Sequence, residues 1–268
     1  MPYAKAFDGT RLYFEETGTG APLLLISGNG ANHTMWDDLR DDFAAHYQSI
    51  TFDHRGTGAS DKPVEPPYST RTFAQDAIAI LDHLAISRTH VYGVSMGGYV
   101  AQWLAIDSPE RVGTLVLGCT GPGGTQTVRR SSEVDALMKR RTADPTGAAR
   151  ALLETVVSPS WLAADPDRSA HLQQRLTAAP PHTMQLHFKA ALAHDAWALL
   201  PTITAPTLII HGSEDVLVPT ANAELMRQRI PGAEVHIIAG GRHGYIWEVR
   251  DEADRAVLEF LKAHPLPA

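Results

Sequence analysis

The sequence predicts an α/β protein: a mostly parallel, doubly wound sheet with helices on both faces and a helical cap inserted into it. Short apolar runs alternate with helical patterns, which is typical of parallel strands joined by helical crossovers. The alternation stops once, because residues 120–201 hold helical segments broken by prolines and no apolar strand run. We therefore expect a core domain of residues 1–121 and 201–268, with residues 122–200 as a helical cap, or lid.

The expected strands and helices follow one another along the chain. Tyr3 to Phe7 and Arg11 to Glu16 alternate around the turn Asp8-Gly9, which predicts an antiparallel hairpin at one edge of the sheet. Six later strands are expected, and the first of them, at residues 22–26, is apolar throughout, as expected of a strand buried on both faces. They are predicted at residues 22–26, 49–52, 89–92, 112–117, 207–211 and 234–238. Core helices are predicted at residues 35–45, 70–84, 99–105, 220–229 and 250–263.

Composition argues against several classes of protein. A hydrophobic fraction of 44% over 268 residues is enough for a sizeable core. A net charge of -7 and a pI near 6.0 leave no basic footprint for nucleic acid. The single cysteine, Cys119, allows no internal disulfide, and the N-terminus lacks the apolar core of a signal peptide. No apolar run is long enough to span a bilayer, so we expect a soluble, cytoplasmic protein without a membrane partner.

One short stretch, His90 to Gly98, reads H-V-Y-G-V-S-M-G-G and separates a strand run from an apolar helical run. Ser95 is therefore predicted on a strand-to-helix turn, with Gly93 and Gly97 two residues to either side. A turn that lifts a serine hydroxyl above a sheet strains the backbone, and its neighbours must lack side chains so that strand and helix can approach. The alternative is an ordinary helix cap, where serine is common.

Several polar residues follow predicted strand ends. In sheets of this kind, ligands bind beyond the carboxyl ends of the strands. The residues that meet this rule are Ser27 to Gly30, Asp53, Ser95, Thr120, Asp215 and His243. Their common position predicts a functional site at that edge of the sheet.

A serine hydroxyl is a poor nucleophile unless a base activates it. His243, in the glycine-rich loop A-G-G-R-H-G-Y, is the candidate base, and a carboxylate is needed to orient its imidazole. Asp215 follows the preceding strand in H-G-S-E-D-V-L-V-P, with Glu214 as the nearest rival. We favour Asp215, because the chain order serine, acid, histidine is the one this architecture uses. The alternatives are a histidine of an exposed loop and an ordinary turn aspartate.

Four motifs in this order resemble those of the α/β-hydrolase fold family, and the resemblance covers nearly the whole chain. It implies that Ser95 is the nucleophile, that His243 is the general base and then the acid, and that Asp215 orients His243. The motifs are F-D-H-R-G-T-G-A-S (52–60), G-V-S-M-G-G (93–98), H-G-S-E-D-V-L-V-P (211–219) and G-R-H-G (241–244).

The resemblance also implies an oxyanion hole of two backbone amides. One comes from the residue after the nucleophile, here Met96. The other comes from the loop after the third strand, where the family usually has His-Gly before the donor and this chain has S-G-N-G with Ser27 in place of the histidine. Asn29 is then the donor by position, and Gly28 takes its place if the loop register slips by one. Each such amide can contribute roughly 3 kcal/mol to the transition state.

Residues 53–60, with the pattern D-x-R-G-x-G-x-S, are shared by the family too. We assign this segment no chemistry. Asp53, Arg55 and Ser60 are expected to hold the loop together by local hydrogen bonds.

Within the family, I-S-G-N-G-A-N-H-T-M-W and S-M-G-G-Y-V-A-Q-W-L-A are similar to the branch of 3-oxoadipate enol-lactonases and small-molecule esterases. The resemblance implies a serine hydrolase that cleaves an ester or lactone of a small, moderately apolar molecule through an acyl-enzyme, with no metal or organic cofactor. A cofactor-free perhydrolase and a hydrolase of carbon–carbon bonds would use the same triad. A ligand receptor with a slow triad is the non-enzymatic alternative.

Substrate contacts are expected from aromatic and imidazole side chains of the cap and of the loop that carries the oxyanion donor, because such groups suit a moderately apolar ligand. Packing between cap and core is the alternative for each of them. The residues that we select are Trp36, His33, Trp161 and Trp197.

Overall fold

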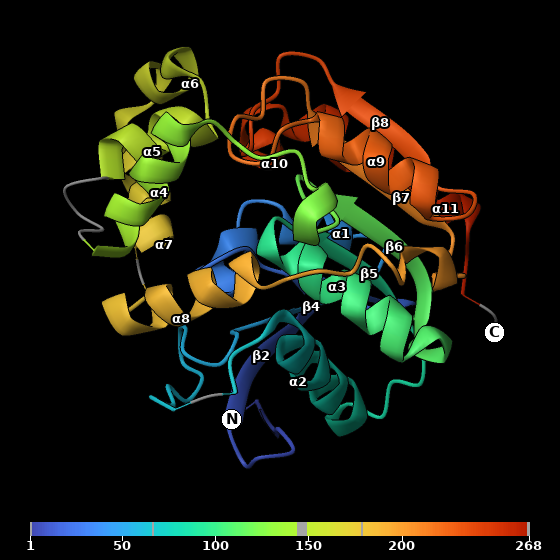
Figure 1. The fold of residues 1–268 in the computed structure, drawn as a ribbon. Coiled ribbons are helices and arrows are strands. Elements are labelled where there is room, and N and C mark those ends of the chain that lie inside the picture. Colours follow the sequence, from blue (N-terminus) through green and yellow to red (C-terminus); the bar gives the residue numbers. More distant parts are fainter. Residues whose placement is uncertain (1, 66, 144–148, 178, 267–268) are drawn as a thin grey trace.

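The computed structural model describes residues 2–65, 67–143, 149–177 and 179–266. An eight-stranded sheet lies at its centre, in the order β1-β2-β4-β3-β5-β6-β7-β8 (Figure 1). The two pairs at one end, β1 with β2 and β2 with β4, are antiparallel, and all other neighbours are parallel. The strands are β1 (Tyr3–Lys5), β2 (Arg11–Thr17), β3 (Pro22–Ile26), β4 (Gln48–Phe52), β5 (Thr89–Val94), β6 (Val112–Gly118), β7 (Thr207–Gly212) and β8 (Glu234–Ile238). The predicted mostly parallel sheet is confirmed.

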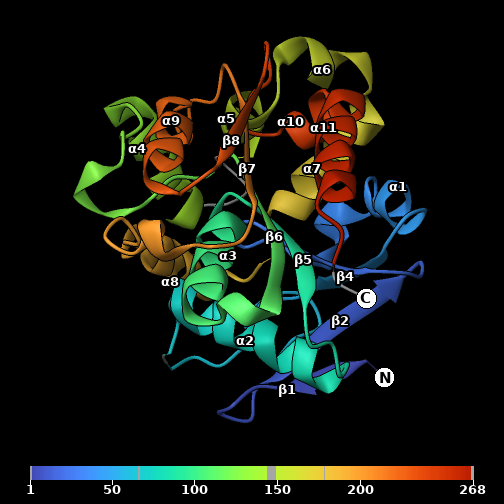
Figure 2. The same cartoon turned by 90° about the vertical axis from the view of Figure 1, so that its right-hand side faces the viewer.

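Helices cover both faces of the sheet, which Figure 2 shows nearly edge-on. One face carries α2 (Thr70–His83), α3 (Met96–Asp107) and α9 (Ala221–Arg229), and the other carries α1 (Arg40–Ala44) and α11 (Arg250–Ala263). Strand β3 divides its side chains between the two cores. Leu24 and Ile26 pack with α2 and α3, whereas Leu23 and Leu25 pack with α1 and α11, as the period of two in a strand requires.

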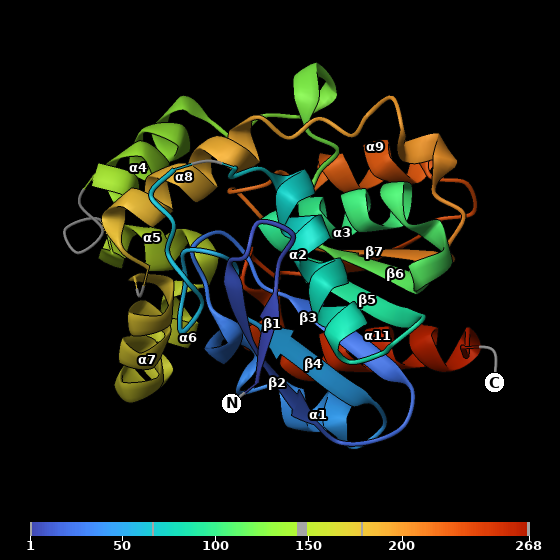
Figure 3. The same ribbon diagram turned by 90° about the horizontal axis from the view of Figure 1, so that it is seen from below.

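The stretch between β6 and β7 folds as helices, as predicted. The described ones are α4 (Ser132–Ala143), α5 (Ala149–Val156), α6 (Pro159–Ala164), α7 (Pro166–Thr177) and α8 (Pro181–Leu192). They gather beside one end of the sheet (Figure 3) around a separate small core that includes Leu152, Leu162 and Leu172. Pro159, Pro166 and Pro181 each open a helix, where the missing N–H leaves no hydrogen bond unmade. The division into core and cap domains stays a prediction.

The helix predicted at 35–45 is two shorter elements, a 3-10 turn, η1 (His33–Trp36), and α1. Met35, Leu39 and Phe43 follow one another at intervals of four and are all buried, which imitates one continuous helix. Their spacing fixes only that they face the core, and a 3-10 turn followed by a short helix satisfies it equally well. A further helix, α10 (Tyr245–Glu248), was not predicted. No described helix is both long enough and apolar enough to cross a membrane.

Candidate active site

Ser95 occupies the turn between β5 and α3, with φ 56° and ψ -120°. Its N–H donates to the Gly118 carbonyl at 2.8 Å, and the Thr120 hydroxyl donates to the Ser95 carbonyl at 2.8 Å. A side chain at Gly93 would lie 2.2 Å from the carbonyl oxygen of Gly97, so the strand and the helix cross in contact. The strained serine is thus held in place from both sides, as the sequence motif predicts.

Gly93→Ala tests this close crossing. Because the new methyl group would meet backbone atoms that cannot move independently, we expect the free energy of unfolding to fall by at least about 2 kcal/mol. Gly240→Ala is the matched control, since it has a positive φ of 71° but nothing within 4 Å of its would-be side chain. It should cost only the backbone strain, about 1–2 kcal/mol. Urea denaturation of both variants measures the difference, and equal losses would contradict the packing argument.

The structure brings the three predicted catalytic side chains together. The Ser95 hydroxyl lies 3.0 Å from Nε2 of His243, and Nδ1 of His243 lies 2.7 Å from Oδ2 of Asp215. They come from the loops after β5, β8 and β7, so all three lie at the carboxyl ends of parallel strands in the same half of the sheet. In this arrangement Nε2 can accept the serine proton while Asp215 fixes the imidazole tautomer.

Asp215 remains ionised although its carboxylate is fully buried. Its Oδ1 accepts hydrogen bonds from the backbone N–H groups of Leu217 and Val218, each at 2.9 Å. Burial raises the pKa of Asp215, but the charge of His243 and the hydrogen bonds from His211 and His243 outweigh burial and hold that pKa below its usual range. The rival acid, Glu214, is exposed and lies near Arg242, with 3.8 Å between the charged groups.

Ser95 and His243 open into a cavity of about 140 Å³, referred to below as the inner cavity. Its other lining side chains are mostly apolar and come from the core and the cap. They include Met35, Val94, Tyr99, Cys119, Arg130, Met138, Leu152, Val156, Leu176, Phe188, Leu192, Leu217, Val218, Ile246 and Trp247. Such a lining suits a small, mostly apolar ligand.

Met96, Gly28 and Asn29 also line the inner cavity. Met96 is the first residue of α3, where a backbone N–H has no partner within its own helix. The loop with Gly28 and Asn29 reaches the serine because Ile26 of β3 pairs with Gly93 of β5. The Gly28 N–H already contacts the sulfur of Met35 at 3.5 Å. The assignment of Asn29, rather than Gly28, as the second oxyanion donor stays a prediction.

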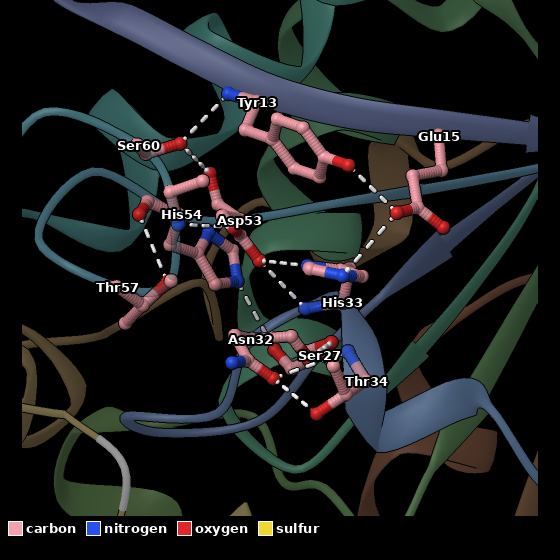
Figure 4. Close-up of polar contacts among 12 residues, drawn as sticks. Tyr13, Glu15, Ser27, Asn32, His33, Thr34, Asp53, His54, Thr57 and Ser60 are labelled. Carbon is pink, nitrogen blue, oxygen red and sulfur yellow. Dashed lines mark hydrogen bonds and ion pairs between the residues drawn. The ribbon is translucent and has the colours of Figure 1, made fainter. Parts of the chain in front are cut away.

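Hydrogen bonds anchor this loop to its surroundings (Figure 4). Nδ1 and the backbone N–H of His33 both contact Oδ1 of Asp53, each at 2.7 Å. His54 donates from Nε2 to the Ser27 carbonyl at 3.1 Å, and the Ser27 hydroxyl donates to the Asn32 carbonyl at 3.1 Å. The loop that carries the candidate oxyanion donor is therefore fixed before any ligand binds.

The local hydrogen bonds expected within residues 53–60 are confirmed for Asp53 and Ser60, whereas Arg55 bonds to residues outside this segment. Asp53 accepts from the Ala59 N–H at 2.7 Å, and the Ser60 hydroxyl donates to the Asp53 carbonyl at 2.7 Å. Arg55 instead reaches out of the loop and pairs with Asp76 and Asp8, at 2.6 and 2.7 Å. This segment therefore ties the loop to α2 and to the hairpin between β1 and β2.

A cap residue, His187 of α8, joins two of these loops. Its Nε2 donates to the Arg55 carbonyl at 2.9 Å, and its Nδ1 accepts from the Gly30 N–H at 3.4 Å. Burial, aided by the nearby His54, lowers the pKa of His187 to about 3 although the bond to Arg55 opposes the shift. The neutral ring thus holds the cap to the loop that carries Asn29.

Stability should depend on pH through His187. An unfolded chain takes up a proton on this histidine below about pH 6.5, whereas the folded protein excludes it until about pH 3, so stability falls as the pH drops through that window. His187→Phe removes the effect. We expect the slope of unfolding free energy against pH, between pH 6.5 and 4.5, to become shallower by up to about 1.4 kcal/mol per unit.

The slope is the informative quantity in this comparison, because His187→Phe also leaves the Gly30 and Arg55 groups unpaired and lowers stability at every pH. All other titrating groups are present in both proteins, so their contributions to the slope cancel in the difference between wild type and His187→Phe. His46→Phe, at an exposed position, is the control and should keep the wild-type slope. Urea denaturation at four pH values measures all three proteins, and an unchanged slope in His187→Phe would contradict the neutral buried ring.

Two of the predicted substrate contacts, Trp36 and His33, do not line the inner cavity. Trp36 is fully buried on the α1 side of the sheet and packs edge-on against Tyr92, with 5.3 Å between ring centroids. His33 points to the carboxylates of Asp53 and Glu15. Burial opposes its protonation, but the bond to Asp53 and both charges raise the pKa of His33. Both side chains contact the loop and the core instead, and neither is among the residues that line the inner cavity.

The other two, Trp161 and Trp197, lie outside the inner cavity as well. Trp161 of α6 stacks under Arg168, whose guanidinium carbon is 3.9 Å from the ring centroid. Trp197 lies under Arg229 at 4.8 Å. Both rings thus contact arginine side chains, which agrees with the packing alternative.

The residues selected from the sequence leave out several that line the cavity, among them Tyr99, Arg130 and Trp247. One of them had a usable signal. Tyr99 follows Ser95 by four residues and lies in the first turns of α3, whose N-cap is Ser95, so its side chain can lie on the same side as the serine. No pattern in the sequence marks Arg130, because it follows a glycine-rich turn whose path the sequence does not determine.

A family model described as the alpha/beta hydrolase fold matches residues 21–249. The chain is 30% identical over 262 residues, 97% of its length and 98% of the relative's, to a protein of Azorhizobium caulinodans whose name assigns it as a carbamate hydrolase, RutD. It is 33% identical to the 2-hydroxy-6-oxononadienedioate/2-hydroxy-6-oxononatrienedioate hydrolase of Burkholderia vietnamiensis, over 95% of this chain and 93% of the other. The structure of a thermophilic esterase from Thermogutta terrifontis is similar with a TM-score of 0.86, at 26% identity and 98% coverage of both chains. The chain belongs to the α/β-hydrolase fold family, and its relatives are hydrolases.

Proposed function

We propose that this protein is a serine hydrolase that cleaves a carboxylic ester or lactone of a small, mostly apolar molecule through an acyl-enzyme. The observation that carries the proposal is the continuous contact from Ser95 through His243 to Asp215, at 3.0 and 2.7 Å. The serine of this triad opens into a mostly apolar cavity, where a carbonyl carbon can be attacked with little water present.

In the first half of the reaction, the Ser95 oxygen attacks the carbonyl carbon while Nε2 of His243 takes the hydroxyl proton. The negative charge that develops on the carbonyl oxygen is stabilised by the N–H groups of Met96 and Asn29. His243 then gives the proton to the departing alcohol oxygen, and the ester bond breaks. The acyl group is left on Ser95.

In the second half, His243 removes a proton from water, which attacks the acyl-enzyme and forms a second tetrahedral intermediate. The proton returns to the Ser95 oxygen as the acid departs. Asp215, kept ionised by its backbone and histidine contacts, stabilises the positive charge that His243 carries in both halves. In a lactone the alcohol remains part of the same molecule, so the product is a single hydroxy acid.

Carbon–carbon bond hydrolysis is a second candidate, favoured by the 33% identity to a hydrolase of 2-hydroxy-6-oxo dienedioates. The same side chains would serve it. An ester or lactone needs a proton only on the leaving oxygen, which His243 can supply, whereas a carbon leaving group must first be made stable by rearrangement of the substrate. Carbamate cleavage, suggested by the name of the other relative, would also use this triad.

A substrate panel tests these alternatives directly. Short-chain esters, γ- and δ-lactones, an alkyl carbamate and a 2-hydroxy-6-oxo dienoate are each assayed with wild type and with Ser95→Ala, and hydrogen peroxide is added to detect peracid formation. We expect many turnovers of esters or lactones by the wild type alone. Turnover of only the carbamate or the dienoate would replace the proposal with that activity, and release of about one equivalent of product would indicate a receptor.

A further inference from the structure

One charge faces the inner cavity besides the catalytic machinery. Among the described residues that line the cavity, Arg130 is the only one whose side chain carries a permanent charge. It lies between β6 and α4, and 19% of its side chain is exposed. A guanidinium beside so many apolar side chains is costly unless an anion accompanies it. The place of the carboxylate that pairs with Arg130 therefore shows which of its N–H groups remain available to a ligand.

The carboxylate that pairs with Arg130 lies outside the inner cavity. Oδ1 of Asp135 accepts from Nε and Nη2 of Arg130, at 3.2 and 2.9 Å. Asp135 lines a second, outer cavity of about 360 Å³ but not the inner one, while Arg130 lines both. Asp135 also pairs with Lys139 at 2.9 Å, so the same carboxylate is shared between two cations. Nη1 of Arg130 has no partner among the described residues.

A second donor lies nearby. Tyr99 of α3 lines both cavities, and no described residue forms a hydrogen bond with its hydroxyl. Its ring stacks on His194 with 4.2 Å between centroids, which restricts the direction of the hydroxyl. Burial raises the pKa of Tyr99 to about 12 although the charge of Arg130 opposes the shift. The hydroxyl therefore keeps its proton and can donate it to an acceptor in the cavity.

We propose that Arg130 and Tyr99 bind a carboxylate of the substrate, so that the favoured ester or lactone is an anion. This inference rests on the proposed function, whose site it extends. A carboxylate would be excluded from a purely apolar pocket, but here it would complete the hydrogen bonding of Nη1 and of the Tyr99 hydroxyl. The apolar lining between these donors and Ser95 would then contact the carbon chain that joins the carboxylate to the reacting carbonyl.

Matched ester pairs test the proposal. Ethyl butanoate, pentanoate and hexanoate are compared with the monoethyl esters of succinate, glutarate and adipate, which replace a terminal methyl by a carboxylate. A second comparison, ethyl acetate against acetoxyacetate, places the carboxylate on the alcohol. We expect that for at least one spacing the wild type has a kcat/KM for the anion equal to or above that for its neutral partner. Preference for the neutral ester in every pair would overturn the proposal.

Two neighbouring arginines provide a variant and its control. Arg130→Gln should lower kcat/KM for the preferred anion by roughly 10- to 100-fold and change the neutral ester less than about 3-fold. Arg129→Gln removes the same charge from an exposed residue that lines the outer cavity but not the inner one. It should leave kcat/KM unchanged for both the anionic and the neutral ester. Equal losses for the two esters in Arg130→Gln, or equal losses of the anion in the two variants, would contradict direct binding.

A binding measurement keeps this inference separate from the proposed reaction. In Ser95→Ala, calorimetry should show tighter binding of the monoethyl ester than of its neutral partner, and adding Arg130→Gln should remove the difference. If the wild type hydrolyses no ester, the proposed function is wrong. The binding comparison in Ser95→Ala still tests whether Arg130 binds a carboxylate. Equal affinities in Ser95→Ala would overturn the carboxylate site, whether or not Arg130→Gln folds.

Discussion

Ser95→Ala is expected to lower kcat on a preferred ester or lactone by roughly 10⁴- to 10⁶-fold while the protein stays folded. The reason is the contact of the Ser95 hydroxyl with Nε2 of His243, since without this oxygen no acyl-enzyme can form. Alanine also removes a side chain that the fold does not need, because the turn is held through the Ser95 backbone and the flanking glycines. The measurement is steady-state hydrolysis with a denaturation curve for each protein.

A control serine makes this result specific. Ser132 is exposed at the wall of the outer cavity, so Ser132→Ala should keep wild-type kcat. Residual activity of Ser95→Ala within about tenfold of the wild type would mean that the hydroxyl is not the nucleophile. Loss of activity accompanied by a collapse of the denaturation midpoint would instead show that the turn, rather than the chemistry, depends on this side chain.

Asp215→Asn is the second large effect, with kcat expected to fall by roughly 10⁴-fold. An amide at this position can present a donor to Nδ1 of His243, which reverses the ring tautomer that the reaction needs. It also removes the charge that stabilises protonated His243. Glu214→Gln alters an exposed carboxylate next to Asp215 in the chain and should change kcat by less than about 3-fold. Steady-state kinetics of the two variants decide between the acids, and the reverse order would show that Glu214 orients His243.

Much of the fold follows from local sequence patterns. Leu23 to Ile26 is apolar throughout because β3 is covered on both faces, and this pattern would persist in any arrangement of the neighbouring helices. The turn at Ser95 is similarly local, since its glycines are required by contacts within a few residues of the serine and with the adjacent strand β3. The serine, acid and histidine could be identified because each follows a strand end, and the sheet then brings those ends together.

The walls of the cavity could not be identified in the same way. Trp36 is selected from the sequence because it follows the loop that carries Asn29, but its side chain enters the core on the α1 side of the sheet, where Tyr92 packs against it. Arg130 reaches the cavity through the segment after β6, in which the Gly121 carbonyl accepts a hydrogen bond from Gln102 of α3, and no periodicity in the sequence predicts such a path. Which cap residues face the site depends on contacts between distant segments, such as His187 with Gly30 and Arg55.

The claim that all of this depends on is that His243 activates Ser95 as a nucleophile. Intact-mass analysis after reaction with a fluorophosphonate probe, followed by peptide mapping, tests it most directly. The account predicts one adduct per chain, located on Ser95, and a labelling rate in His243→Ala that is lower by a factor of at least roughly 10³. An adduct on another residue, or an equal labelling rate without the imidazole, would contradict it.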